Sequence, residues 1–232
     1  MKAAIVLLLG ALLLTSCAIE SEPYTTMTSG TRFTFLALGD SYTIGESVTA
    51  AERWPVQLAA ALREQGIPMG EPEIIARTGW TTAELLAAIE DSYDGEPYDL
   101  VSVLIGVNDQ YRGYSVAEYR EAFKALLNAA SAAAGGHSDH IIVLSIPDWG
   151  ATPFGERANR ANISAEIDAF NAVNRAESLA AGVKYFDITP TTRPPVMDAS
   201  MLAGDGLHPG GAIYALWVER VLPYVVNLLG RE

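Results

Sequence analysis

Five apolar runs, each followed by a segment with helical signals, constrain the fold of this 232-residue chain more than any other feature. The runs are predicted to be strands at 33–39, 73–76, 100–105, 141–146 and 183–188. Most of them are apolar except for a single polar residue, which is typical of strands that are covered on both faces of a sheet. Repeated alternation of strand and helix favours right-handed crossovers and a parallel sheet between two helical layers.

Residues that start and end helices mark the segments between the predicted strands. The segments that begin at Thr81 and Ser115 both have glutamate three residues later, the spacing of a capping box, so each should open a helix. Pro55 suits the first turn of another helix. Pro209 is expected to open a final helix that reaches about Leu229.

Length and charge limit the classes of protein that the chain can belong to. We assign residues 32–232 to one domain of moderate size. The formal net charge is −13 at pH 7, which opposes binding to a nucleic acid because that affinity comes largely from Lys and Arg. The only cysteine is Cys17, so a metal site built on thiolates is excluded.

The N-terminal residues have the pattern of an export signal. Lys2 precedes an apolar run over 3–14 that is shorter than the roughly 20 residues a membrane-spanning helix needs. Leu14-Thr15-Ser16-Cys17 resembles the lipobox of bacterial lipoproteins. The resemblance implies a signal peptide over 1–16, lipid attachment at Cys17 and a tether over 17–31. An ordinary secretory signal with an incidental cysteine is the alternative. We expect an exported protein, anchored to the periplasmic or outer face of a bacterial membrane.

Two segments far apart in the sequence contain the residues of a split catalytic triad. Ser41 follows the first predicted strand, and Asp205 lies three residues before His208 in a loop bounded by glycine and proline. A nucleophilic serine needs a base within hydrogen-bond reach and a third group that orients the base. Singly, Ser41 fits an ordinary turn, and Asp205 and His208 fit a capped turn at the surface. Only folding can bring the two segments together.

Two further candidates also follow predicted strands. Gly79 comes after the second strand and Asn108 after the third, whereas the Asp205 loop lies beyond the fifth. Sites in open parallel sheets form at the carboxyl ends of the strands, so all these residues are expected at one edge. The backbone N–H of Gly79 and the side-chain amide of Asn108 could donate to an oxyanion, although either residue is also routine in a loop.

Taken together, these segments resemble the SGNH hydrolases, also called the GDSL esterase/lipase superfamily. The four blocks, in the family's order, are Gly39-Asp40-Ser41, Gly79, Gly106-Val107-Asn108-Asp109 and Asp205-Gly206-Leu207-His208-Pro209. The resemblance runs from about residue 32 to the final helix and implies an α/β fold: a flavodoxin-like, three-layer arrangement with a five-stranded parallel sheet. Tyr42 stands where the family's name motif has leucine.

The resemblance also implies roles for individual residues. Ser41 would be the nucleophile, His208 the base and Asp205 the group that orients the base. The oxyanion hole would consist of the N–H groups of Ser41 and Gly79 and the amide of Asn108. No metal or organic cofactor is implied.

The implied activity is hydrolysis of a carboxylic ester through an acyl-enzyme on Ser41. The expected partners are a small-molecule, lipid or sugar ester and, through Cys17, a membrane. Two alternatives keep the same fold: an acyltransferase that acts on sugars or lipids, and a non-catalytic surface-binding lipoprotein. Tyr111, Trp149 and Phe154 follow predicted strands and could line the substrate pocket, but loop packing explains them equally well.

His137, Asp139 and His140 are the remaining cluster of metal-ligating residue types. They follow two glycines in a polar turn that leads into the fourth predicted strand. We interpret this segment as a structural loop and expect no metal site.

Overall fold

Five parallel strands form one sheet in the order β2-β1-β3-β4-β5. They are β1 (Phe35–Gly39), β2 (Glu73–Ala76), β3 (Leu100–Leu104), β4 (Ile141–Leu144) and β5 (Lys184–Phe186). Each strand lies within the range predicted for it. The order is that of flavodoxin-like doubly wound sheets, so the predicted fold class is confirmed.

The computed structural model describes residues 32–158, 161–194 and 197–230. They belong to a compact unit that begins at Thr31. The predicted signal peptide and the whole of the predicted tether, including Cys17, lie outside the described residues. The boundaries proposed for those segments stay predictions.

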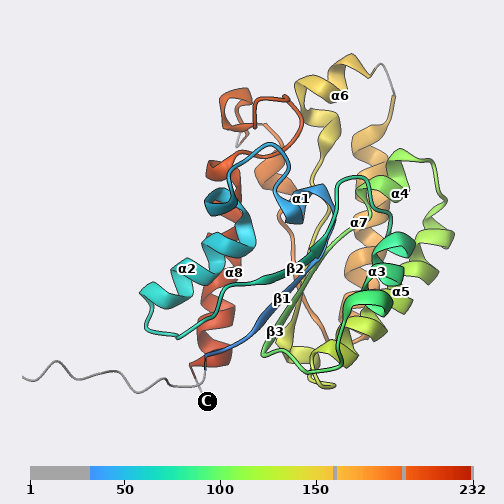
Figure 1. The fold of residues 1–232 in the computed structure, drawn as a ribbon. Helices are drawn as coiled ribbons and strands as arrows, with labels where there is room; N and C mark the ends of the chain where they lie inside the picture. Colours follow the sequence, from blue (N-terminus) through green and yellow to red (C-terminus); the bar gives the residue numbers. More distant parts are fainter. Residues whose placement is uncertain (1–31, 159–160, 195–196, 231–232) are drawn as a thin grey trace, which may run out of the picture. The chain divides into compact units, whose positions relative to one another are not determined.

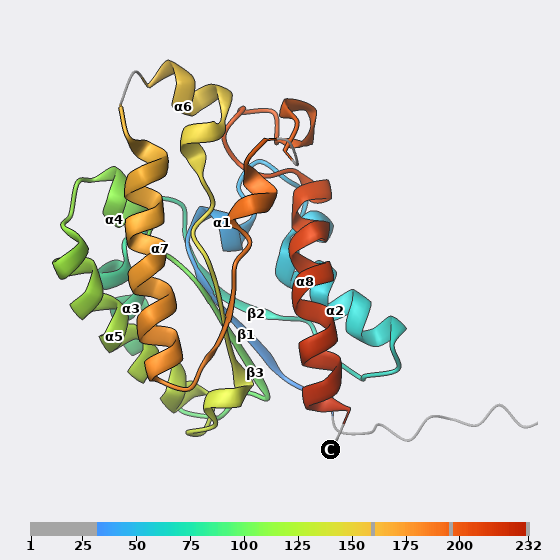
Figure 2. The ribbon, with the colours of Figure 1, turned by 180° about the vertical axis from the view of Figure 1, so that it is seen from behind.

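Helices cover both faces of the sheet (Figures 1 and 2). One face carries α2 (Trp54–Glu64) and α8 (Gly211–Leu229), which pack on each other. The other carries α3 (Thr82–Ser92), α5 (Val116–Ala133) and α7 (Ile163–Ala180), with α5 between the other two. Three short helices lie near one end of the sheet: α1 (Ser41–Ile44), α4 (Val107–Tyr111) and α6 (Pro153–Arg157).

Burial follows the position of each strand in the sheet. All residues of β1, β3 and β4 are buried, whereas the edge strands β2 and β5 are partly exposed. The apolar helix α8 is long and apolar enough to cross a membrane by length and composition alone. In this fold one side of the helix, which includes Tyr214 and Trp217, is buried in the core. Its composition therefore suits a core helix of this domain.

The predicted helix starts agree with the structure except at the last helix. Thr81 and Ser115 both form complete capping boxes, and Pro55 lies in the first turn of α2. The final helix begins at Gly211, two residues later than predicted from Pro209. The reason is that Pro209 forms an isolated antiparallel bridge with Leu202, which keeps its backbone in the loop.

Candidate functional site

Ser41 is the first residue of α1 and lies directly beyond the carboxyl end of β1. Asp40 caps this helix, because its Oδ1 accepts the Tyr42 N–H at 3.0 Å. The turn is tight: a Cβ atom added to Gly39 would lie 2.6 Å from the carbonyl oxygen of Leu104. Glycine is therefore required at the end of the strand for the chain to turn and present Ser41.

Asp205 and His208 form a hydrogen-bonded pair. Asp205 Oδ2 lies 2.7 Å from His208 Nδ1 and accepts the Ser47 hydroxyl at 2.8 Å. Asp205 Oδ1 accepts the backbone N–H groups of Leu207 and His208, both at 2.9 Å. Burial acts to raise the pKa of Asp205, but these hydrogen bonds outweigh it and lower the pKa to about 2. An ionised carboxylate only accepts, so Nδ1 carries the hydrogen and Nε2 is left as an acceptor.

One cavity of about 230 Å³ brings the predicted residues together. Ser41, Gly79, Asn108 and His208 all line it, and Asp205 reaches it through its bond to His208. The remaining lining residues are Tyr42, Thr78, Val107, Tyr111, Trp149, Phe154 and Leu207. The cavity thus combines a hydroxyl, an imidazole and an amide with a largely apolar wall. Such a combination suits a small organic ligand with one polar centre.

Asn108 is held in the first turn of α4. The turn before it needs Gly106, whose φ is +121° and where an added Cβ atom would lie 2.8 Å from the Tyr119 ring. Asn108 Nδ2 donates to the carbonyl of Trp80 at 2.9 Å. An amide nitrogen has two hydrogens, so one donor remains after this bond. Arg112 donates to the carbonyl of Gly79 at 2.5 Å, which fixes the backbone on the carboxyl side of that glycine.

Two buried carboxyl groups lie beside these residues in the sequence. Burial raises the pKa of Asp40 to about 8, against the lowering effect of the Tyr42 N–H. Asp40 Oδ2 has no hydrogen-bond partner among the described residues. Burial also raises the pKa of Asp109, whose Oδ2 accepts both the N–H and the hydroxyl of Thr82 at 3.0 Å. Asp109 therefore ties α4 to the start of α3.

Two residues that the sequence patterns did not single out support the site. Ser47 donates to Asp205 across 158 positions of sequence. Gln110 is buried and accepts the indole N–H of Trp149 at 2.8 Å. Neither belongs to a motif, and serine and glutamine are usually exposed, so no sequence signal could have identified them.

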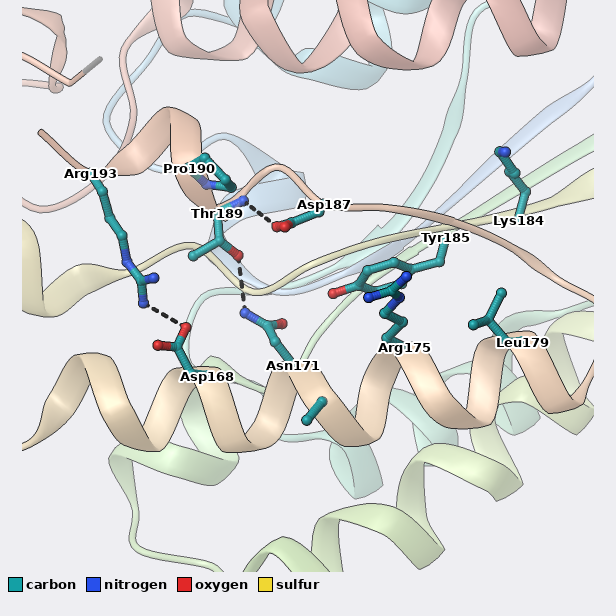
Figure 3. A pocket seen from close by; sticks show the side chains of 11 residues that line it. Asp168, Asn171, Arg175, Leu179, Lys184, Tyr185, Asp187, Thr189, Pro190 and Arg193 are labelled. Atoms are coloured by element: carbon teal, nitrogen blue, oxygen red, sulfur yellow. Dashed lines mark hydrogen bonds and ion pairs between the residues drawn. The ribbon is translucent and has the colours of Figure 1, made fainter. Parts of the chain in front are cut away.

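A larger cavity of about 560 Å³ lies between α7 and β5 (Figure 3). Its polar groups are largely bonded to one another: Arg193 pairs with Asp168 at 2.8 Å, and Asn171 donates to Thr189 at 3.0 Å. Among the described residues that line it, there is no histidine, serine or cysteine to act on a substrate. The smaller cavity beside Ser41 is therefore the candidate site.

The structure places the potential ligand atoms of His137, Asp139 and His140 within 4.8 Å of one another. They lie on a short turn just before β4, at the amino-terminal end of the strands, whereas Ser41 lies at the carboxyl end. The turn is held by a hydrogen bond from Tyr224 to the carbonyl of Asp139 at 2.8 Å. The cluster has the chemistry to bind a cation but is separate from the cavity.

A sequence model of the GDSL-like Lipase/Acylhydrolase family matches residues 37–216. This span contains Ser41, Gly79, Asn108, Asp205 and His208. No protein of curated function matches the chain.

Solved structures with the same fold include several hydrolases. A lipase/acylhydrolase from Enterococcus faecalis is 22% identical with a TM-score of 0.66, over 86% of this chain and 96% of that one. The esterase EstA from Pseudoalteromonas sp. is 18% identical with a TM-score of 0.60, over 85% and 98%. AlinE4, an SGNH-hydrolase family esterase, is 23% identical with a TM-score of 0.58, over 86% and 98%. At these identities the similarity concerns the fold.

The raised pKa of Asp40 predicts an unusual dependence of stability on pH. The folded-state value of about 8 lies above the unfolded value of about 4, so between them the folded protein keeps a proton that the unfolded chain has lost. This group therefore makes the free energy of unfolding fall as the pH rises through that window. Replacing Asp40→Asn should reduce the fall, as measured by urea unfolding at pH 5 and pH 8.

The exposed Asp91→Asn variant is the control and should show the same fall as the wild type. If Asp40→Asn also kept the full fall, burial of Asp40 would not be its cause.

Proposed function

Because the chain belongs to the GDSL-like lipase/acylhydrolase family, we propose that it hydrolyses carboxylic esters with Ser41 as the nucleophile. The observation that carries the proposal is the Asp205–His208 pair, whose imidazole lines the same cavity as Ser41. Nucleophile, base and orienting acid are the parts that serine catalysis requires. The esterases among the similar folds support the class of reaction.

In the proposed reaction, Ser41 Oγ attacks the carbonyl carbon of the ester while His208 Nε2 takes the hydroxyl proton. The carbonyl oxygen becomes an oxyanion, and the N–H groups of Ser41 and Gly79 and the free amide hydrogen of Asn108 donate to it. His208 then gives the proton to the leaving alcohol, which breaks the ester bond and leaves the acyl group on Ser41. Water attacks this acyl-enzyme, His208 accepts its proton, and the acid is released with Ser41 restored.

Asp205 acts in this scheme by staying ionised. Its low pKa keeps the carboxylate charged at neutral pH, where it stabilises the imidazolium that forms on His208. The hydrogen bonds from Ser47 and from two backbone N–H groups hold the carboxylate in one orientation. The imidazole is therefore kept with Nε2 available as the base.

Replacing Ser41→Ala should lower kcat for ester hydrolysis by at least about 10⁴-fold, since it removes the nucleophile and leaves the rest of the cavity in place. The measurement is hydrolysis of p-nitrophenyl acetate, together with labelling by a fluorophosphonate probe that reacts with activated serines. The exposed Ser92→Ala variant is the control and should keep both activity and labelling. Unchanged hydrolysis by Ser41→Ala would refute the proposal. Product analysis with an added alcohol acceptor separates hydrolysis from acyl transfer.

Replacing Asp205→Asn should lower kcat by about 10³- to 10⁴-fold with a smaller effect on KM, because the amide permits the wrong imidazole tautomer. The measurement is steady-state kinetics of the same ester. Ser47→Ala is the matched comparison: it removes one of the hydrogen bonds to Asp205 and should cost far less activity. Equal effects of the two variants would show that Asp205 only supports the loop.

We also propose that the protein is exported and lipid-anchored through Cys17, a proposal supported by Leu14-Thr15-Ser16-Cys17 and the preceding apolar run. When the full chain is expressed in a bacterial host, it should be recovered in the membrane fraction, since more than one acyl chain gives stable anchoring. Cys17→Ala should move it to the soluble or secreted fraction. A Cys17→Ala protein that stayed with the membrane would exclude the lipid anchor.

A further inference from the structure

Three aromatic rings form a continuous wall of the cavity beside Ser41. Tyr111 comes from α4, whereas Trp149 and Phe154 come from the segment after β4. The Trp149 ring lies in the middle, with centroid distances of 5.4 Å to Tyr111 and 6.1 Å to Phe154. Trp149 is also the buried member of the three, at 2% exposure against 53% for Tyr111. The innermost part of this wall is therefore the indole of Trp149.

Hydrogen bonds inside the protein fix the orientation of that indole. Its N–H donates to Gln110 Oε1 at 2.8 Å, and Gln110 Nε2 donates to Glu166 Oε2 on α7 at 2.5 Å. Gln110 is 1% exposed, so turning the indole away would leave buried polar groups without partners. The free-energy cost of losing these hydrogen bonds holds the Trp149 ring in one orientation.

The backbone that carries Trp149 is anchored as well. Asp148 is buried, and its two carboxylate oxygens accept the Gly150 N–H at 2.9 Å and Arg193 Nε at 2.7 Å. Arg193 in turn pairs with Asp168 on α7 (Figure 3). A ligand therefore meets a wall that is held from both the side chain and the main chain.

The size of the cavity limits what can fill it. An enclosed apolar cavity of about 150 Å³ binds benzene, which has six carbon atoms, so the walls of this open cavity of about 230 Å³ can surround roughly nine non-hydrogen atoms. The carbon and two oxygens of an ester account for three of these. About six atoms remain for the chain attached to the carbonyl group.

The direction of that chain follows from the proposed reaction, on which this inference rests. The oxyanion must face the donors on Gly79 and Asn108, and the leaving alcohol must face His208. The acyl chain is the group left to meet the aromatic wall. We propose that Trp149, held by Gln110, sets the acyl specificity and restricts the protein to esters of short acyl chains, from acetyl to about heptanoyl.

The test compares kcat/KM for p-nitrophenyl acetate, hexanoate and decanoate. The wild-type protein should lose at least about tenfold between hexanoate and decanoate, because even one methylene group that a pocket cannot accept costs about tenfold or more. Trp149→Ala should raise the ratio of decanoate to acetate activity by at least about tenfold. The exposed Tyr114→Ala variant, whose ring does not line the cavity, is the aromatic control and should leave the ratio within about twofold.

Gln110→Leu tests the positioning role separately, because leucine removes both hydrogen bonds while keeping a side chain of similar length. It should raise the same ratio in the same direction, through a lower KM for decanoate with little change in kcat. A merely structural role of Gln110 would lower activity on all three esters alike. If Trp149→Ala does not fold, Gln110→Leu still tests whether the fixed Trp149 ring limits the acyl chain.

The outcomes separate this inference from the proposed function. If the wild-type protein cleaved none of the esters and Ser41 did not react with the fluorophosphonate probe, the proposed function would fail. If it cleaved decanoate as well as acetate, Trp149 would not limit the chain and only the inference would be overturned. The same holds if a folded, probe-reactive Trp149→Ala and Gln110→Leu both kept the wild-type ratio.

Discussion

The rest of the site depends on the hydrogen bonds that the carboxylate of Asp205 accepts. The carboxylate accepts hydrogen bonds from Nδ1 of His208, from the Ser47 hydroxyl and from two backbone N–H groups. These bonds keep the carboxylate ionised. Through Ser47 it joins the last loop of the chain to the loop just after α1. One group therefore sets the tautomer of His208, the shape of its own loop and the approach of that loop to Ser41. Charge-assisted bonds of this kind are about twice as strong as neutral ones, which suits a contact that must hold two distant segments.

The sheet supplies the second condition, because its parallel strands all end at one edge. Ser41 follows the inner strand β1, Gly79 follows the edge strand β2, and Asn108 follows β3 on the other side of β1. A local feature fixes each residue. Ser41 lies in a short capped helix, Gly79 receives a hydrogen bond from Arg112 at its carbonyl, and Asn108 follows the turn at Gly106. The carboxyl groups of Asp40 and Asp109 accept hydrogen bonds in these segments. Their raised pKa values are the cost of turns that are buried against the core.

The aromatic wall of the cavity, formed by Tyr111, Trp149 and Phe154, is held in a different way. Its residues are apolar, and the polar bonds that fix Trp149 come from behind the wall, through Gln110 and Glu166. In the proposed reaction, the polar groups would face the reacting carbonyl and the fixed aromatic surface would face the acyl chain. Under this proposal, the polar side of the cavity carries the reaction and the aromatic side sets the size of the acyl group.

The amino-acid sequence by itself determined the five strands, the helix starts at Thr81 and Ser115 and the order of the four motif blocks, because periodicity, capping and turn chemistry act within a few residues. It also indicated that Ser41 and His208 would meet, since parallel strands end together. Only the tertiary structure decided the bond from Ser47 to Asp205, the bond from Gln110 to Trp149, the volume of the cavity and the later start of α8. These depend on side chains and backbone segments packed from distant parts of the chain, and no local pattern encodes which of them will touch.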